Sequence, residues 1–394
     1  MGKLINMKTF FQLLGNEFRR IFSNGVVIAI FFGAPMMYAV LVGYVYKKGK
    51  VVELPIAVID YDQTPLSDRV IDALDDNENI KIAKVYFDNN EIRKDLIQYD
   101  YQAVVTIPTH FEGEILQKRY PEVSVDINTG NILTANYASR GIQTVLATLN
   151  VGFEMESLKK QGLSTIQAMG HYESFKISIN RVFNAGSNYM EFLWPGVIGI
   201  VMQQVFLLVM ALSFARDFED GYFNSTVKVS RSAFYHLLIK IVPVYLLGTL
   251  VWIALGGMFS YFDIAFPVFS SKMALLAILF TTACMFLGIL VSLLIPNQLK
   301  ATEILMIIAT PSFIIGGFTW PLEAMSPVVQ AIAKCIPSTP FLQGFRKLMV
   351  YDGNLCDIKP QLVSLSWIMI VSILLSVIVL QVKIILAKKA MANK

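Results

Sequence analysis

The sequence is poor in charged residues, cysteine and histidine. Only 16% of its 394 residues are charged, whereas 55% are hydrophobic, and soluble domains carry about 25% charged residues. Three cysteines are too few for a disulfide-stapled fold, and three scattered histidines argue against a histidine-rich metal site. The net charge of +4 is small. These shortages disfavour a soluble enzyme, a disordered chain and a nucleic-acid-binding protein, and favour an integral membrane protein.

Common catalytic motifs are absent as well. The sequence has no G-x-x-x-x-G-K-[ST], G-x-S-x-G, H-E-x-x-H or C-x-x-C, so it lacks the usual loop that cradles ATP phosphates. We therefore expect no enzymatic activity, no cofactor and no metal in this chain. Cys335 and Cys356 fall in the same predicted external loop, where either a disulfide or two free thiols are possible.

Long apolar runs without acidic or basic residues occur six times. Each reaches or approaches the ~20 residues that a helix needs to cross a bilayer. They are residues 26–46, 192–215, 241–262, 273–295, 304–322 and 362–382. The first run is longer than the apolar part of a signal peptide and no cleavage pattern follows it, so we expect an uncleaved anchor. The sequence thus predicts an α-helical polytopic membrane protein with six transmembrane helices.

Basic residues predict the orientation of these helices. Residues 47–191 hold 15 basic and 20 acidic residues, whereas the rest of the chain holds 18 basic and 9 acidic residues. An even number of spans places both termini on one side. We expect a multi-pass protein of the bacterial inner membrane with both termini in the cytoplasm. Lys334, Arg346, Lys347 and Lys359 run against the trend, because they fall in the last external loop.

Residues 47–191 have the pattern of a small periplasmic α/β domain, inserted between helices 1 and 2, with long connecting helices. Short β-rich runs alternate with amphipathic helical segments. The predicted strands are residues 54–60, 80–87, 103–107 and 123–127. Helices are predicted over 67–74, over 89–99, and from 134 to about 178.

The segments outside the spans have distinct patterns. Residues 1–25 contain an amphipathic helix suited to the cytoplasmic interface, or a simple extension of the first span. Residues 216–240 mix charges with aromatic residues and predict a cytoplasmic loop or helix that docks a partner, or a solvated connector. Residues 323–361 are proline-rich and predict an external re-entrant region. Residues 383–394 form a cytoplasmic tail.

The predicted spans contain no charged residue. Gln203 and Gln204, with Thr281 and Thr282, are the most polar side chains deep within them. They are candidates for a translocation path or for hydrogen bonds between packed helices. Without deep charges, coupling to an ion gradient is not expected. Because spans 1–3 and 4–6 show no internal repeat, we expect the chain to be half of a two-fold assembly.

A distinctive stretch begins at residue 316 and reads GGFTWPLEAM, followed by Pro327, by IPSTPF at 336–341 and by GFR at 344–346. It is similar to the S/G-G-x-x-x-P…M-P…P-[LS]-T…R signature of the permease subunits of ABC-2 type ATP-binding-cassette exporters. The matching residues are Gly317, Pro321, Glu323, Pro327, Pro337, Thr339 and Arg346. In that family the region forms short external re-entrant helices. Ser326 departs from the pattern, since the family has proline directly after the methionine.

Three other stretches support the resemblance, which covers essentially the whole chain and points to the bacterial branch with a large external domain. Residues 17–20 (EFRR) resemble the interfacial helix, and residues 181–196 resemble the entry to span two. Residues 219–222 (EDGY) occupy the place of the family's E-R-G-T coupling motif, and Lys240 matches its G-K-x-x-P. The resemblance therefore assigns an ATPase-coupling role to Arg216, Asp217, Glu219, Gly221 and Lys240.

The resemblance implies a function. The chain would form a translocation path in the lipid bilayer with a second permease copy or paralogue, and would export drugs or other amphiphilic molecules. A separate cytoplasmic ABC ATPase would bind ATP and Mg. In relatives such external domains accompany a periplasmic adaptor and an outer-membrane duct. The alternative is a membrane-anchored receptor or cell-envelope assembly factor that uses its external α/β domain.

Overall fold

The computed structural model describes residues 7–88, 92, 95, 98–172, 180, 182–264 and 266–392. The chain divides into two compact units. The helical unit comprises Met1–Gly49 and Arg181–Lys394, and the sheet unit comprises Lys50–Asn180. In chain order, the sheet unit stands between the first and second long apolar helices. Each unit has its own hydrophobic core.

Among the described residues, six helical segments of the helical unit are long and apolar enough to cross a membrane. Four are continuous: α9 (Tyr189–Glu219), α11 (Ala233–Tyr261), α12 (Ser271–Leu294) and α17 (Lys359–Ala392). The first segment joins α2 (Gly25–Ile28), a π-helical turn (Ala29–Gly33) and α3 (Ala34–Val45). The fifth joins α13 (Gln298–Ala309) and α14 (Ser312–Ile315).

These helices differ in length from the predicted spans. Helices α9 and α11 extend beyond their charge-free runs, so Asp217 and Lys240 lie inside helices and not in a connecting loop. The predicted loop or helix over 216–240 thus contains the end of α9, all of α10 (Tyr222–Val229) and the start of α11. The fifth segment begins at Gln298, where Asn297 Oδ1 accepts the Lys300 N–H at 2.9 Å, and it ends at Ile315, before the predicted residue 322.

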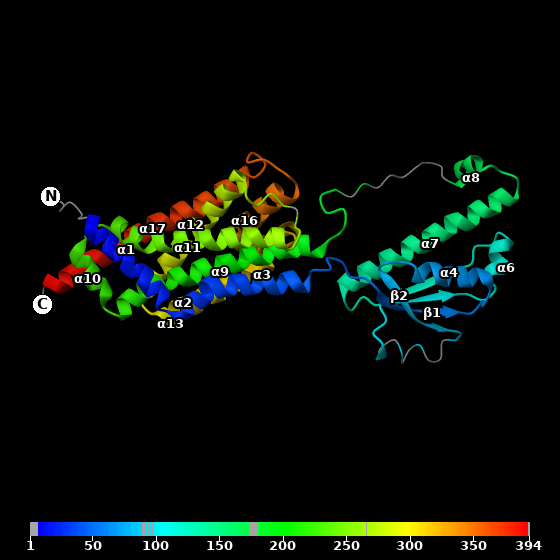
Figure 1. Ribbon diagram of the computed structural model, residues 1–394, viewed down its shortest axis with the longest axis horizontal. Coiled ribbons are helices and arrows are strands. Elements are labelled where there is room, and N and C mark those ends of the chain that lie inside the picture. Colours follow the sequence, from blue (N-terminus) through cyan, green and yellow to red (C-terminus); the bar gives the residue numbers. More distant parts are fainter. Residues whose placement is uncertain are drawn as a thin grey trace. The chain divides into compact units, whose positions relative to one another are not determined.

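Shorter helices lie at the two ends of the helical unit. Helix α1 (Met7–Phe22) and helix α10 (Tyr222–Val229) lie at one end, and α16 (Ser338–Phe345) lies at the other (Figure 1). The predicted re-entrant region also contains a 3-10 turn (Leu322–Ala324), α15 (Pro327–Lys334) and a π-helical turn (Arg346–Val350). Residues 1–6 of the predicted N-terminal segment and residues 393–394 of the predicted tail lie outside the described residues.

Helix α9 forms the centre of the helical unit. Its Trp194, Phe206 and Phe214 are almost completely buried, and Trp194 Nε1 donates to the Ala39 carbonyl at 2.9 Å. Helix α12 approaches α9 closely at Gly288, where an added Cβ would lie 2.6 Å from the Leu207 carbonyl oxygen. Small residues at helix interfaces permit such close packing in membranes.

The sheet unit contains a four-stranded sheet in the order β2-β1-β3-β4. Its strands are β1 (Leu54–Asp60), β2 (Ile80–Tyr86), β3 (Ala103–Ile107) and β4 (Ser124–Ile127). Strand β1 pairs in parallel with β2 and β3, whereas β4 is antiparallel to β3. All four predicted strands are thus present, and the mixed sheet agrees with the α/β prediction.

Helices cover one face of this sheet. They are α4 (Pro65–Asp75), α6 (Phe111–Leu116) and α7 (Ile132–Lys160), and α8 (Thr165–Tyr172) follows. Side chains of β1 alternate between two cores, with Ile56 and Val58 facing the helices and Ile59 facing the other side. The helix predicted over 89–99 lies mostly outside the described residues.

Candidate functional site

Four charged side chains meet at the end of the helical unit that holds α1 and α10. We call them the ion cluster: Glu17 and Arg20 of α1, Asp217 of α9, and Lys240 of α11. Lys240 Nζ lies 2.8 Å from Glu17 Oε1 and 2.7 Å from Asp217 Oδ2. Arg20 Nη1 contacts Asp217 Oδ1 and lies 3.3 Å from Glu17 Oε1. The cluster joins three helices that are far apart in sequence.

The ion cluster is buried and electrically balanced. Glu17, Asp217 and Lys240 are 8%, 1% and 7% exposed. Burying an unpaired charge is costly, so two acids and two bases must compensate one another. Burial alone would lower the pKa of Arg20, but attraction to Asp217 and Glu17 raises it above its ordinary value. The paired charges of the cluster tie α1 to α9 and α11.

The cluster continues toward α10 through the exposed Asp220 and the half-buried Arg216 and Tyr222. Arg20 Nη2 lies 3.3 Å from Asp220 Oδ2, and its guanidinium carbon lies 4.5 Å from the centre of the Tyr222 ring. Arg216 Nη1 donates to the Arg20 carbonyl at 3.2 Å. Arg20 thus contacts both the turn before α10 and the first residue of α10, so a displacement of α10 would act on the ion cluster.

Glu219 ends α9 and contacts the start of α13. Its Oε1 accepts hydrogen bonds from Asn297 Nδ2 at 2.8 Å and from the Gln298 N–H at 3.0 Å, and Gln298 Nε2 donates to its Oε2. A carboxylate at a helix N-terminus satisfies free N–H groups and is favoured by the helix dipole. Glu219 therefore links the α9–α10 turn to the fifth membrane segment.

Gly221 turns the chain between α9 and α10. Its φ of +68° lies in the left-handed region, which glycine adopts without the steric penalty of a Cβ. Helix α10 then buries Phe223 and Val227. The Phe223 ring lies 4.7 Å from the Phe218 ring of α9. The turn and the buried face fix the orientation of α10, while its other face stays exposed.

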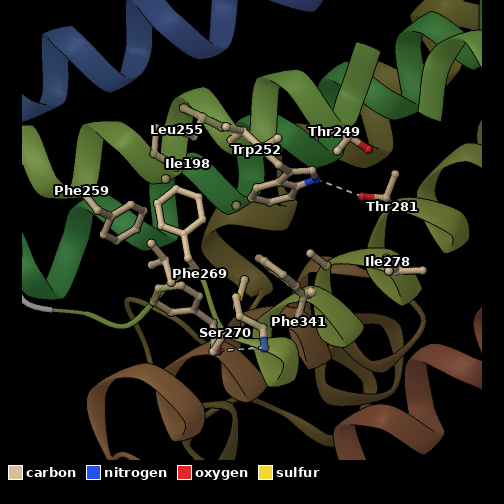
Figure 2. Close-up of a pocket in the computed structure, with 18 of the residues that line it drawn as sticks. Ile198, Thr249, Trp252, Leu255, Phe259, Phe269, Ser270, Ile278, Thr281 and Phe341 are labelled. Atoms are coloured by element: carbon tan, nitrogen blue, oxygen red, sulfur yellow. Dashed lines mark hydrogen bonds between the residues drawn. The ribbon is translucent and has the colours of Figure 1, made fainter. Parts of the chain in front are cut away.

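An apolar pocket of about 470 Å³ lies between α9, α11, α12 and α16. Figure 2 shows its aromatic lining, with Trp252, Phe259, Phe269 and Phe341 pointing into the space. Trp252 Nε1 donates to Thr281 Oγ1 at 3.1 Å. The lining is mainly apolar, and its other polar residues are Tyr245, Thr249, Ser270 and Ser271. Its volume falls within the roughly 300–1,000 Å³ typical of small-molecule sites.

Of the four predicted path residues, only Thr281 lines this pocket. Thr282 lies beside it and shares a hydrogen bond with the Tyr245 hydroxyl. Gln203 is fully buried elsewhere, where its Nε2 donates to Ser312 Oγ at 2.9 Å and its Oε1 accepts the Ser338 N–H at 2.8 Å. Gln203 therefore joins α9 to α14 and α16. Gln204 is half-buried on α9.

The residues of the predicted re-entrant motif shape the short helices. Gly317 has a φ of +75°, and an added Cβ would lie 2.5 Å from Leu322 Cγ. Pro321 and Pro337 precede the 3-10 turn and α16, and Pro327 begins α15. Glu323 is exposed, whereas Thr339 is buried on α16.

Arg346 connects this region to α9, since its guanidinium carbon lies 5.7 Å from the centre of the Phe192 ring. Its Nη2 donates to the Phe318 carbonyl at 2.8 Å, and its guanidinium carbon lies 4.6 Å from the centre of the Phe318 ring. Burial lowers the pKa of Arg346. Cys335 and Cys356 are both free. Within the described ranges, no group of three or more His, Cys, Asp or Glu residues could hold a metal ion.

Sequence reasoning missed several residues of this site. Glu17 and Arg20 were visible only as part of an amphipathic helix, although their i, i+3 spacing places both on one face. Asn297 and Gln298 gave the weak signal of a helix start. Trp252 gave no signal, because an aromatic residue inside an apolar span is ordinary packing material.

Comparison with known proteins places the geometry in context. Residues 26–378 match the family described as ABC-2 family transporter protein. The chain is 28% identical over 176 residues to the probable multidrug ABC transporter permease YbhS of Escherichia coli strain K12, covering 44% of this chain and 46% of that protein. It is 21% identical over 320 residues to the inner membrane transport permease YhhJ of the same strain, covering 79% and 80%. The match to YbhS thus spans about half of that relative's length.

Proposed function

Because this chain belongs to the ABC-2 family of transporter proteins, we propose that it is the membrane-spanning permease subunit of an ATP-driven exporter. A separate cytoplasmic ABC ATPase binds ATP and Mg and supplies the energy. The observation that carries this proposal is the position of Glu219, which hydrogen-bonds the start of α13 directly before the turn into α10.

Helix α10 is the element that receives the motion of the ATPase. Its exposed face is available to a partner, and its first turn contacts Arg20. A push on α10 reaches α13 through Glu219, and reaches α1, α9 and α11 through the ion cluster. These contacts favour one arrangement of the helices, and ATP binding shifts the population to another.

The proposed topology places α1, α10 and both termini in the cytoplasm. The sheet unit then lies on the periplasmic side of the bacterial inner membrane. The surplus of basic over acidic residues outside 47–191 supports this orientation. The short helices around Arg346 are external in this arrangement.

The substrates we propose are drugs or other amphiphilic molecules. The apolar pocket supports this class, since aromatic side chains line it and Trp252 Nε1 donates to Thr281 Oγ1. The name of YbhS, a probable multidrug permease, agrees. Ile253 and Ile278 line the pocket and are more than half exposed, so an apolar molecule can enter it sideways from lipid.

The working assembly contains two permeases. Apolar residues Met306, Ile307 and Ile314 of the fifth segment are exposed, and a second copy or paralogue covers them across the translocation path. A periplasmic adaptor and an outer-membrane duct are further partners that the sheet unit is placed to contact.

The test is ATP hydrolysis by the complex purified with its ATPase and reconstituted in lipid. Glu219→Ala removes both acceptors of the α13 contacts, so we expect the substrate-stimulated part of the hydrolysis to be lost while basal hydrolysis remains. Glu303→Ala is the matched control, because it removes an exposed carboxylate of α13 itself. Normal stimulation in the Glu219→Ala complex would overturn the assignment of α10 and Glu219 to coupling.

A further inference from the structure

The sheet unit contains a pocket of its own, of about 560 Å³. We call it the sheet-unit pocket. Its walls come from α4, α6, the segment from α6 to Val123 and the second half of α7. The proposed transport function does not use this pocket. Its size lies within the range of roughly 300–1,000 Å³ that is typical of small-molecule sites.

One side of the sheet-unit pocket is apolar and fixed in place. Val70 and Phe111 are 1% and 4% exposed, so their positions are set by the core. Phe153 of α7 is held by the Arg69 guanidinium, whose carbon lies 5.3 Å from the ring centre. Arg69 is in turn paired with Glu156 at 3.0 Å. This wall can accept an apolar chain without rearranging.

The other side is cationic. Lys118 and Arg119 follow α6, line the pocket and are exposed. The turn that carries them is fixed by two hydrogen bonds, from the Lys118 N–H to Ile115 O at 3.0 Å and from the Arg119 N–H to Glu114 O at 2.8 Å. Lys118 adopts a left-handed φ of +57°, a conformation that costs a non-glycine residue about 1–2 kcal/mol.

The positive charges on this side of the pocket outnumber the negative ones. Among the residues that the structure describes, neither Lys118 nor Arg119 forms a salt bridge with a carboxylate. Glu154 is the acidic residue in the lining, so two positive groups face one negative group. Cations in a fixed turn beside an apolar wall are suited to an anionic head group, and Arg favours carboxylate, sulfate or phosphate oxygens.

We propose that the sheet-unit pocket binds a single-chain anionic amphiphile. The tail lies against Phe111, Leu149 and Phe153, and the head group binds Lys118 and Arg119. A neutral apolar molecule would leave the two cations uncompensated, and a strongly charged polyanion would leave the apolar wall without a partner. Binding needs neither ATP nor a second subunit, so this proposal can fail or hold independently of the transport function.

The test is photolabelling of the full chain in nanodiscs of zwitterionic phosphatidylcholine. The probe is dodecanoate with a diazirine near its tail end, and the labelled peptides are identified by mass spectrometry. We expect labels within residues 111–123 and 146–157. Decanoate should compete for this labelling, whereas decanol and decyltrimethylammonium should not. Equal competition by the cationic compound, or labels confined to the helical unit, would overturn the proposal.

Variants test the role of the two cations. Lys118→Gln combined with Arg119→Gln should reduce the labelling about tenfold, because both charge-assisted hydrogen bonds to the head group are lost. The control is Lys159→Gln combined with Lys160→Gln, which removes two exposed charges of α7 outside the pocket lining. An equal loss in the control would reduce the effect to general surface charge and contradict the proposal.

A last arm identifies the source of the amphiphile. Lysophosphatidylglycerol added to the nanodisc presents the same single-chain anionic chemistry from the membrane. Loss of labelling in its presence assigns the site to a membrane lipid. Unchanged labelling, with decanoate still competing, assigns it to a free amphiphile, and either result supports an anionic ligand.

Discussion

At the scale of single residues, the ion cluster decides how α1, α9 and α11 are held together. Its four charges sum to zero in a nearly dry environment, so each side chain depends on the others. Removing one partner of a buried pair leaves a charge without compensation, which typically costs about 3–5 kcal/mol. Removing an acid and a base together leaves a neutral pair.

Lys240→Met should therefore destabilise the helical unit by about 3–5 kcal/mol, since Glu17 and Asp217 are left with Arg20 alone. The double variant Lys240→Met/Glu17→Gln should recover part of the loss, because Arg20 and Asp217 still pair. Thermal unfolding in detergent, monitored by size-exclusion chromatography, measures the stability of both variants. Lys300→Met changes an exposed lysine of α13 and serves as the control.

This account would be contradicted if the losses of stability of Lys240→Met and of Glu17→Gln simply added up in the double variant. Simple additivity would mean that the two side chains act independently. It would remove the argument that the cluster is one balanced unit.

Asp75 makes a pH-dependent contribution to the stability of the sheet unit. Its carboxylate accepts from Lys81 Nζ and from the Ile82 N–H, at 2.8 and 3.0 Å, and these bonds lower the pKa of Asp75. A carboxyl group whose pKa is lowered on folding stabilises the folded state at pH values above its unfolded-state pKa of about 3.9. This stabilisation is lost as the pH falls through the folded-state pKa.

Hydrogen-exchange protection of β2 in the full chain, corrected for intrinsic rates, should therefore fall between about pH 5 and about pH 3. Asp75→Asn should show lower protection at the upper pH and a weaker pH dependence. Asp76→Asn, at the exposed neighbouring position, should keep the wild-type dependence. If Asp75→Asn kept the wild-type slope, another group would be responsible.

At the scale of elements, the close contact of α12 with α9 limits what can stand at Gly288. Gly288→Ala should push the two helices apart, since the new methyl group would meet the Leu207 carbonyl at 2.6 Å. Gly257→Ala is the matched control in α11, because nothing lies within 4 Å of its added Cβ. We expect the first variant to lose thermal stability. The second should be neutral or gain up to ~1 kcal/mol from helix propensity, and equal effects would contradict the packing argument.

The turn before α10 makes a second prediction at this scale. Gly221→Ala meets no steric contact but must adopt the left-handed conformation, which costs about 1–2 kcal/mol. We expect weaker coupling to the ATPase with normal insertion, and partial recovery in Gly221→Asn, because asparagine tolerates this conformation. The measurement is substrate-stimulated ATP hydrolysis by the reconstituted complex. Equal activity of the Ala and Asn variants would show that the backbone conformation at Gly221 is not what matters.

Elements were predictable from the sequence where one local pattern sufficed. Strands such as 103–107 follow from runs of β-branched residues between turns, and α1 follows from its apolar periodicity. The helix ends could not be predicted where a helix continues through charged residues. Lys240 and Asp217 continue their helices because they neutralise one another across the fold, and no single-chain pattern reveals that pairing.

The apolar pocket could not have been predicted for the same reason. It forms between helices that are distant in sequence, and its residues resemble ordinary membrane packing. Thr281 was singled out for its polarity, but its hydroxyl serves Trp252. Gln203 was singled out in the same way, and its amide joins α9 to α14 and α16.

At the scale of the whole molecule, a chain of the ABC-2 family combines a helical unit and a sheet unit. The helical unit holds the proposed input at α10 and the apolar pocket among α9, α11, α12 and α16. The sheet unit holds a separate pocket with a cationic rim. In this account transport needs the first unit and an ATPase, while the second unit adds recognition outside the membrane.

The most direct test of the central claim is purification of the tagged full chain from its native membrane in a mild detergent, with mass spectrometry of the proteins that accompany it. The account predicts a stoichiometric ATPase that carries the phosphate-binding loop missing from this chain. Glu219→Ala should still insert into the membrane. A folded chain that is recovered alone, reproducibly and under conditions that preserve other transporter complexes, would contradict the account.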